Sequence, residues 1–227
     1  MNSPNPNTPL AHLGCAACVL IAAISGTIST ALPAFQEWML QVPIVMPLLF
    51  LALLTAAYLL EHALTTSAIL LLLISAAVCG GCTLGGYSLT GAGLVWQILA
   101  GPLCYFATAA LVLHCWPETL YRWQLCCIFT LAGVLGALLS SWLCGHSPIS
   151  GLCALLFTCT VATFELIVLF GKDYFEITSA SRTRSTVLAM LMLQAMPVYK
   201  IIWNLLIASR YSIGGIGRFI WHWFRWM

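Results

Sequence analysis

The sequence TSAILLLLISAAVCGGCTL, residues Thr66–Leu84, decides the fold class of this chain. It is nineteen residues long and contains no charged side chain. About twenty apolar residues in a helix are enough to cross the hydrocarbon core of a bilayer. The stretch also lacks the alternation of apolar and polar residues that a half-buried strand would show. It therefore predicts a membrane-spanning helix.

Six further segments of similar length and composition lie on either side of this one. They are Leu13–Leu32, Val42–Leu60, Leu94–His114, Trp123–Leu143, Gly151–Phe170 and Val187–Ala208. The sequence thus predicts an all-α fold, a polytopic membrane bundle of six to seven helices that forms a single domain over residues 13–208. Residues 1–12 are predicted to be a short polar leader. Residues 209–227, which are basic and aromatic, are predicted to be a tail at the membrane interface.

The composition excludes the common classes of soluble protein. Of the 227 residues, 62% are hydrophobic and only 6% are charged, whereas soluble domains carry about a quarter charged residues. Disorder is excluded because it requires low hydrophobicity and high net charge. The net charge of +2 is too small for a nucleic-acid-binding surface. The lipid bilayer is therefore the expected partner of most of the surface.

Lys and Arg are distributed unevenly among the predicted loops. The loops after the fourth and sixth segments contain Arg122, Lys172, Arg182 and Arg184, whereas those after the first, third and fifth contain neither residue type. The positive-inside rule places the basic loops and the N-terminus in the cytoplasm. We expect an integral protein of a bacterial inner membrane or a eukaryotic endomembrane. The arginines of the tail conflict with a full seventh crossing, so the last helix is expected to be central or re-entrant.

Glu165 is an acidic residue placed inside an apolar segment. It lies in TVATFELIVLF, about five residues from the end of the sixth predicted span. A carboxylate at this depth is costly, and such residues usually face a bundle interior, a partner or a water-filled cavity. Two interpretations follow. Glu165 extends to the interface toward Lys172 or Arg182, or it forms a proton- or cation-responsive site.

The last predicted span contains a polar stripe. Pro197, Lys200 and Asn204 share one helix face by their spacing, and Pro197 predicts a kink. Gln194 lies six residues before Lys200, more than one turn away but not far around the helix. The stripe is either a packing surface with Lys200 reaching the interface, or Lys200 pairs with Glu165 and holds a pore closed. Glu165, Gln194, Lys200 and Asn204 are therefore the candidate ion-pathway or gating residues.

The eleven cysteines predict packing and not chemistry. The pairs Cys15-x-x-Cys18 and Cys79-x-x-Cys82 lie in apolar segments and lack the further ligands of a tetrahedral zinc site. Buried cysteine behaves as a small apolar side chain. The Gly-His-Ser sequence at 145–147 lacks the Gly-x-Ser-Gly form of an intramembrane serine protease, and no phosphate loop or His–Glu metal pair is present. We therefore expect no enzyme activity, no cofactor and no metal site.

The third segment ends in the glycine-rich sequence CGGCTLGG, residues Cys79–Gly86. Gly81 and Gly85 are four residues apart, a spacing that lets two membrane helices approach closely. Because the motif is common in membrane helices, it predicts packing and says little about function.

From Leu71 to Ala208 the order of segments resembles the Bax-inhibitor family of transmembrane proteins. CGGCTLGGYS resembles the Gly-Leu-Thr-Leu-Ser-like exit of that family's third span, and VWQILAGPLCYFATAALVLH and CIFTLAGVLGALLSSWL resemble its fourth and fifth spans. ALLFTCTVATFELIVLFGKDYFEI resembles the sixth, with Glu165 at the place of the family's Asp. STVLAMLMLQAMPVYKIIWNLL resembles the final helix.

The resemblance implies six helices around a seventh, with a pH-responsive leak of cations, often calcium. In that scheme two carboxylates on the last two helices share a proton, since like-charged neighbours raise one pKa. This chain departs from the scheme because no Asp or Glu follows Glu176. Gln194 stands about where the second carboxylate belongs, and Lys200 brings a positive charge nearby. A contact of Glu165 with Lys200 or Gln194 is the expected replacement.

Three functions therefore remain as alternatives. The first is a cation leak channel for calcium or protons. The second is a non-conducting scaffold or regulatory protein that binds other membrane proteins through its helices and tail. The third is a small-solute carrier in which the kinked final helix lines the substrate site.

Overall fold

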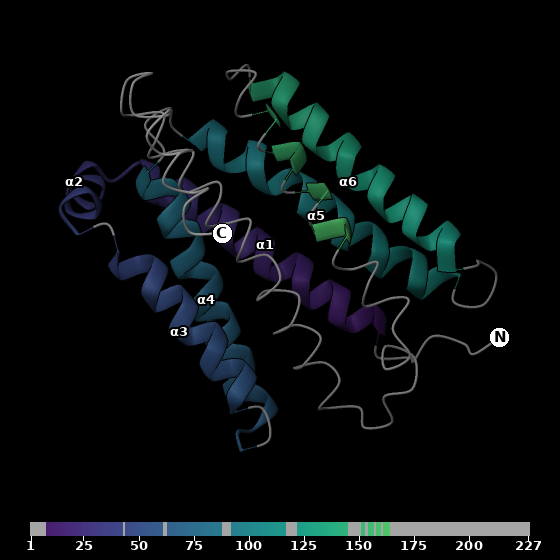
Figure 1. The fold of residues 1–227 in the computed structure, drawn as a ribbon, viewed down its shortest axis with the longest axis horizontal. Coiled ribbons are helices and arrows are strands. Elements are labelled where there is room, and N and C mark those ends of the chain that lie inside the picture. Colours follow the sequence, from purple (N-terminus) through teal and green to yellow (C-terminus); the bar gives the residue numbers. More distant parts are fainter. Residues whose placement is uncertain are drawn as a thin grey trace, which may run out of the picture.

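A computed structural model describes residues 8–42, 44–60, 63–87, 92–116 and 122–144, and most of a further helical segment within 151–163 (Figure 1). Over these residues all regular elements are helices. They are α1 (Thr8–Thr30), α2 (Pro33–Gln41), α3 (Val45–Leu59), α4 (Thr66–Tyr87), α5 (Ala92–Cys115) and α6 (Arg122–Cys144). The prediction of an all-α fold is confirmed for the described part of the chain.

Four of the described helices are long and apolar enough to cross a membrane, namely α1, α4, α5 and α6. The pair α2 and α3 makes a fifth candidate, bent by 85° at the break between the two helices. The described residues thus provide four or five of the six to seven predicted crossings. The predicted last span, Val187–Ala208, and the tail at 209–227 lie outside the described residues.

The structure differs from the predicted boundaries near the N-terminus. Helix α1 begins at Thr8, within the stretch predicted as a leader. Helix α2 occupies residues for which the sequence predicts no span. Its first turn contains Pro33, whose fixed φ suits a helix start. The residue before a proline is pushed out of the helical region, and Leu32 accordingly has φ −112° and ψ 89°, which separates α2 from α1.

Helix α1 lies between two helix pairs (Figure 1). It packs against α4 on one side, where α3 completes one pair, and against α5 on the other, where α6 completes the second pair. Helices α4 and α5 share only a small contact. The order of neighbours across the molecule is therefore α3, α4, α1, α5 and α6.

Glycines bring α1 and α4 into backbone contact. A Cβ atom on Gly81 would overlap the carbonyl oxygen of Ala22 and the hydroxyl of Ser25, and one on Gly85 would overlap the carbonyl oxygen of Gly26. The Ser25 hydroxyl also donates across the interface to the carbonyl oxygen of Val78 at 3.3 Å. The predicted close approach at Gly81 and Gly85 is confirmed.

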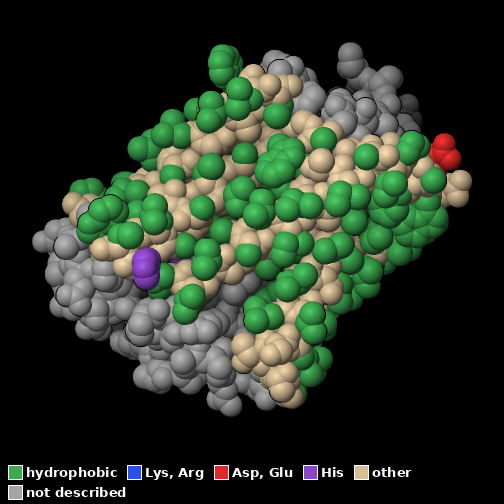
Figure 2. Space-filling model, turned by 180° about the vertical axis from the view of Figure 1, so that it is seen from behind, with side chains coloured by type: hydrophobic (Ala, Val, Ile, Leu, Met, Phe, Trp, Pro, Cys, Tyr) green, Lys and Arg blue, Asp and Glu red, His purple; other side chains and the backbone are tan. Residues whose placement is uncertain are grey.

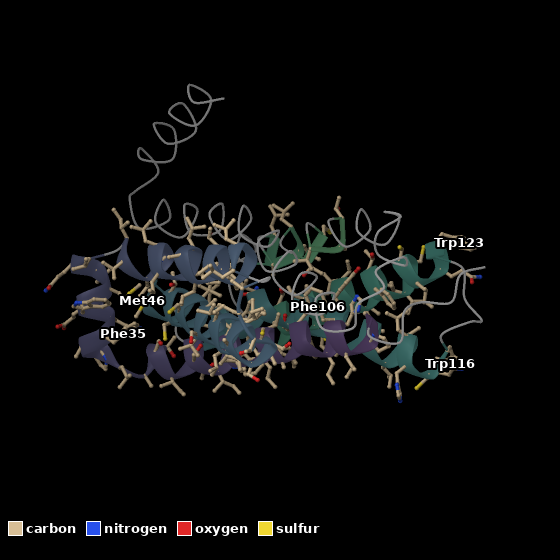
Figure 3. The ribbon with its side chains drawn as sticks, turned by 90° about the horizontal axis from the view of Figure 1, so that it is seen from below. Phe35, Met46, Phe106, Trp116 and Trp123 are labelled. Atoms are coloured by element: carbon tan, nitrogen blue, oxygen red, sulfur yellow. The ribbon has the colours of Figure 1, made fainter. Side chains whose placement is uncertain are left out.

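The outer surface has the character expected in lipid. Hydrophobic side chains cover the face shown in Figure 2, and charged groups of the described residues are visible only at its edge. On α6, Leu131 is 60% exposed and Trp142 is 78% exposed. Exposing such side chains is unfavourable in water but not in the hydrocarbon of a bilayer. Trp116 and Trp123 lie at the same end of the molecule (Figure 3), and aromatic residues are common at membrane interfaces.

If α6 crosses the membrane, the thiols of Cys115 and Cys144 should lie on opposite sides of it. Cys115 ends α5 next to the start of α6, whereas Cys144 ends α6. A helix of 23 residues is about 34 Å long, which exceeds the roughly 30 Å hydrocarbon core. In sealed vesicles of uniform orientation, a membrane-impermeant maleimide is expected to label only one of these two thiols until detergent opens the vesicles.

The measurement is mass spectrometry of the labelled peptides. Cys15, which is buried, is the internal control and should stay unlabelled before and after detergent. Labelling of Cys115 and Cys144 from the same side of intact vesicles would contradict a full crossing by α6.

Candidate functional site

The four residues predicted as an ion pathway, Glu165, Gln194, Lys200 and Asn204, lie outside the described residues. Their contacts with one another therefore stay predictions. The described segment nearest to them is 151–163, which ends two residues before Glu165. The surroundings of that segment are the part of the structure that bears on the predicted site.

Polar side chains are buried where α5, α6 and segment 151–163 meet. Gln97 on α5 and Thr158 are fully buried, and Ser140 on α6 is 9% exposed. The hydroxyl of the adjacent Ser141 is buried as well. We call these four residues the polar seam. Burying a polar group is costly without a hydrogen bond. The polar seam therefore needs hydrogen-bond partners, unlike the apolar contacts in the rest of the bundle.

Two residues of the seam bond to nearby backbone. The Ser140 hydroxyl lies 3.0 Å from the carbonyl oxygen of Ala137 and 3.3 Å from that of Gln97, so it links α6 to α5. The Thr158 hydroxyl donates to the carbonyl oxygen of Ala154 at 2.9 Å. Bonds of this kind are usual for hydroxyls in helices, and the one across α5 and α6 helps to hold the two helices together.

The other two residues of the seam have polar atoms without a hydrogen-bond partner in the described structure. These atoms are Nε2 and Oε1 of Gln97 and Oγ of Ser141. Both side chains border Gly151, since a Cβ atom built there would lie 3.6 Å from Ser141 Oγ and 3.7 Å from Gln97 Nε2. Three elements thus bring two unsatisfied polar side chains to one glycine.

Thr158 is enclosed by glycines of both neighbouring helices. A Cβ atom on Gly101 of α5 would overlap the Thr158 hydroxyl, and one on Gly133 of α6 would lie 2.8 Å from its methyl group. These glycines let segment 151–163 approach α5 and α6 closely, which is how small residues act in membrane bundles. Thr158 therefore fixes the face that this segment turns toward the bundle.

A second buried group lies at the junction of α1 with α5 and α6. His12 is fully buried, and its ring centroid lies 6.3 Å from those of Phe106 and Phe129. Tyr105 meets Phe129 edge to face at 5.8 Å, an arrangement that aromatic rings prefer. Figure 3 shows Phe106 in the middle of the molecule. The cluster joins α1 to the α5–α6 pair.

Some of the described cysteines are packing residues, whereas Cys115, Cys127 and Cys159 are exposed. Cys15, Cys18 and Cys79 belong to the hydrophobic core, as the sequence predicts. None of the ten cysteines within the described ranges forms a disulfide bond. Over the same ranges, no three His, Cys, Asp or Glu side chains come together as metal ligands.

Sequence reasoning did not single out Gln97, Ser141 or Thr158. Gln97 is one amide in the apolar run VWQILAG, and Ser141 follows another serine near a helix end. A usable signal is the seven-residue spacing of Gly151, Thr158 and Glu165, because residues seven apart lie on one helix face.

Comparisons with known proteins assign no family to this chain. No protein-family model matches it, and neither a curated protein nor a solved structure is significantly similar to it. The apolar helices described above are those of a membrane protein.

Proposed function

We propose that this protein is a channel of Bax-inhibitor type, through which protons or cations such as calcium leak under the control of Glu165. The observation that carries the proposal is the polar seam between α5, α6 and segment 151–163. Polar residues inside a membrane bundle commonly mark the path of an ion or a proton.

The spacing of residues connects the seam to Glu165. Gly151 borders Gln97 and Ser141, and Thr158 is enclosed seven residues later on the same segment. Glu165 follows after another seven residues. A helix continuing through the predicted span Gly151–Phe170 would carry Glu165 on the face that Gly151 and Thr158 turn toward the bundle.

The polar seam and Glu165 have the chemistry that a calcium or proton leak needs. Carboxylate and amide carbonyl oxygens, as in Glu165 and Gln97, are ligands that calcium prefers. A carboxyl group in the bundle also changes its charge with pH, and a nearby cation stabilises its charged form. In the proposed closed state, Glu165 pairs with Lys200. Protonation of Glu165 removes this attraction, so the leak is expected to rise as the pH falls.

The test is calcium flux through the full chain in liposomes that contain a calcium-sensitive dye, measured over a series of pH values. The wild-type chain should leak faster than empty vesicles, and faster at acid than at neutral pH. Glu165→Gln should leak at a pH-independent rate, because an amide does not titrate and cannot form the ion pair. At neutral pH its rate should exceed that of the wild type by about tenfold or more, since a hydrogen bond to a charged group contributes about 1.5–3 kcal/mol.

Glu37→Gln is the matched control. It makes the same chemical change on a carboxylate that is exposed on α2, so the flux should keep its pH dependence. A wild-type flux equal to that of empty vesicles at every pH would contradict a channel and favour the non-conducting scaffold. A Glu165→Gln flux identical to the wild type would contradict the role of Glu165.

A further inference from the structure

The side-chain amide of Gln97 is fully buried, yet the packing gives it no hydrogen bond within the described part of the chain. The buried hydroxyl of Ser141 is in the same condition. A buried polar group without a partner loses its hydration and gains nothing in return. Two such groups facing one glycine therefore point to a ligand that bonds to both.

The atoms present decide the chemical class of that ligand. The Gln97 amide offers two N–H donors and one carbonyl acceptor, and the Ser141 hydroxyl both donates and accepts. A bare cation would bind the oxygens but leave the N–H groups unsatisfied. An anion would leave the amide oxygen unsatisfied. Water donates and accepts, and buried water typically makes about three hydrogen bonds to such groups.

The position of the site suits an exchangeable water molecule. Gln97 is five residues from the start of α5 at Ala92, and Ser141 is three residues from the end of α6 at Cys144. These distances along a helix are about 8 Å and 5 Å. The start of α5 and the end of α6 lie at the same end of the bundle (Figure 1), so both groups are close to one membrane surface.

Gly151 has room for a Cβ atom next to the two polar groups. A Cβ atom at this position would meet nothing closer than 3.6 Å, an ordinary van der Waals distance, whereas a Cβ atom on Gly101 would overlap Thr158. The glycine at 151 is thus not required for close helix packing. It adds no side chain of its own beside the two buried polar groups.

We propose that Gln97, Ser141 and Gly151 form a water-binding site at one end of the polar seam. The role of this water in transport rests on the proposed function. There it hydrates a proton or a cation that enters the seam on its way to Glu165, on the membrane side where α5 starts. The site itself does not depend on transport, because it follows from the unsatisfied groups alone.

Solid-state NMR of the full chain in lipid nanodiscs tests the site directly. The chain has five glutamines, so selective ¹⁵N labelling gives few side-chain amide signals, and Gln97→Met identifies the one from Gln97. Magnetisation transfer from water should reach that amide as readily as the amide of Gln41, which is exposed. Transfer no greater than to backbone amides at the centre of α5 would overturn the proposal.

Neighbouring serines provide a matched pair of variants. Ser141→Ala should reduce transfer from water to the Gln97 amide by at least about half, because it removes one of the partners that a bridging water needs. Ser140→Ala should leave it unchanged, because this hydroxyl bonds to backbone carbonyl oxygens. Equal effects of the two variants would contradict a site at Ser141.

Thermal unfolding gives an independent answer. In a dry site, Gln97→Met would replace an unsatisfied amide with an apolar side chain and raise the unfolding midpoint. With water bound, the variant should lower the midpoint by about 2–4 °C. Water contact at Gln97 in a chain without flux would contradict the proposed function and leave the site intact. Flux through a chain with a dry Gln97 would contradict the site alone.

Discussion

Gly85→Leu is expected to separate α1 from α4 and to prevent the native bundle from forming. A Cβ atom at this position would overlap the carbonyl oxygen of Gly26 and lie 2.8 Å from the Cβ atom of Ser29. The first of these neighbours is backbone, which cannot rotate away as a side chain can. Overpacking a core typically costs about 1–3 kcal/mol, and a leucine wedged between two backbones should exceed this range.

The measurement is size-exclusion chromatography in detergent together with the thermal unfolding midpoint. Gly80→Leu is the matched control, on the same helix, because a Cβ atom there would meet the ring of Phe50 at 3.1 Å. A ring can move by a few tenths of an ångström, so this variant should remain folded with a smaller loss. Equal midpoints for the Gly85 and Gly80 variants would show that the α1–α4 contact is looser than described.

Phe129→Ala is expected to have the second largest effect. Phe129 is fully buried on α6 and contacts Tyr105 and His12, so its removal leaves a cavity where α1, α5 and α6 meet. Truncation of a buried phenylalanine costs about 3–5 kcal/mol in soluble proteins. We expect the lower part of that range, because in a bilayer the loss is mainly of packing contacts and not of burial from water.

Leu135→Ala on the same helix is the control for this prediction. Leu135 is 56% exposed and faces the surroundings of the bundle, where lipid tails can fill the space that a shorter side chain leaves. Unfolding by titration with a denaturing detergent in mixed micelles should show a large loss for Phe129→Ala and little change for Leu135→Ala. Similar losses for the two variants would mean that Phe129 does not hold the three helices together.

The spans could be predicted well because hydrophobicity alone specifies them. The predicted segment Thr66–Leu84 and the observed helix α4, Thr66–Tyr87, share their first residue. The predicted segment Leu94–His114 lies within α5, Ala92–Cys115. A long apolar stretch must satisfy its backbone internally, so its length fixes a helix without reference to any neighbour.

Helix α2 could not be predicted in the same way. It is nine residues long and mixes polar with aromatic residues, so its sequence resembles that of a loop. Its position depends on a tertiary contact, since Met39 is fully buried and lies against Gly86 at the end of α4.

The burial of His12 could not be predicted from sequence either. Its polar type and place near the N-terminus suggest a leader, but its burial depends on rings from α5 and α6.

The candidate site was accessible from sequence through its two charged residues and through Gln194 and Asn204, which lie near Lys200 in the sequence. Glu165 and Lys200 stand out because a charge is rare in an apolar segment. Gln97, Ser141 and Thr158 do not, because small and polar uncharged residues occur in every span of this chain. Hydrophobicity also fails to distinguish a lipid-facing side from a helix-facing side when both are apolar. Only the packing of Gly101 and Gly133 around Thr158 reveals which side of segment 151–163 faces the bundle.

The place of α1 between the two helix pairs has a consequence for biosynthesis. Chains are made from the N-terminus at about 5–20 residues per second, so α1 enters the membrane before the other described helices. Its two main partners, α4 and α5, begin at Thr66 and Ala92 and are made after α2 and α3. Until then the face of α1 that receives Gly81 and Gly85 lacks its partner helix. Helix α1 is therefore inserted before its partners, and a nascent chain that stops before Thr66 contains neither of them.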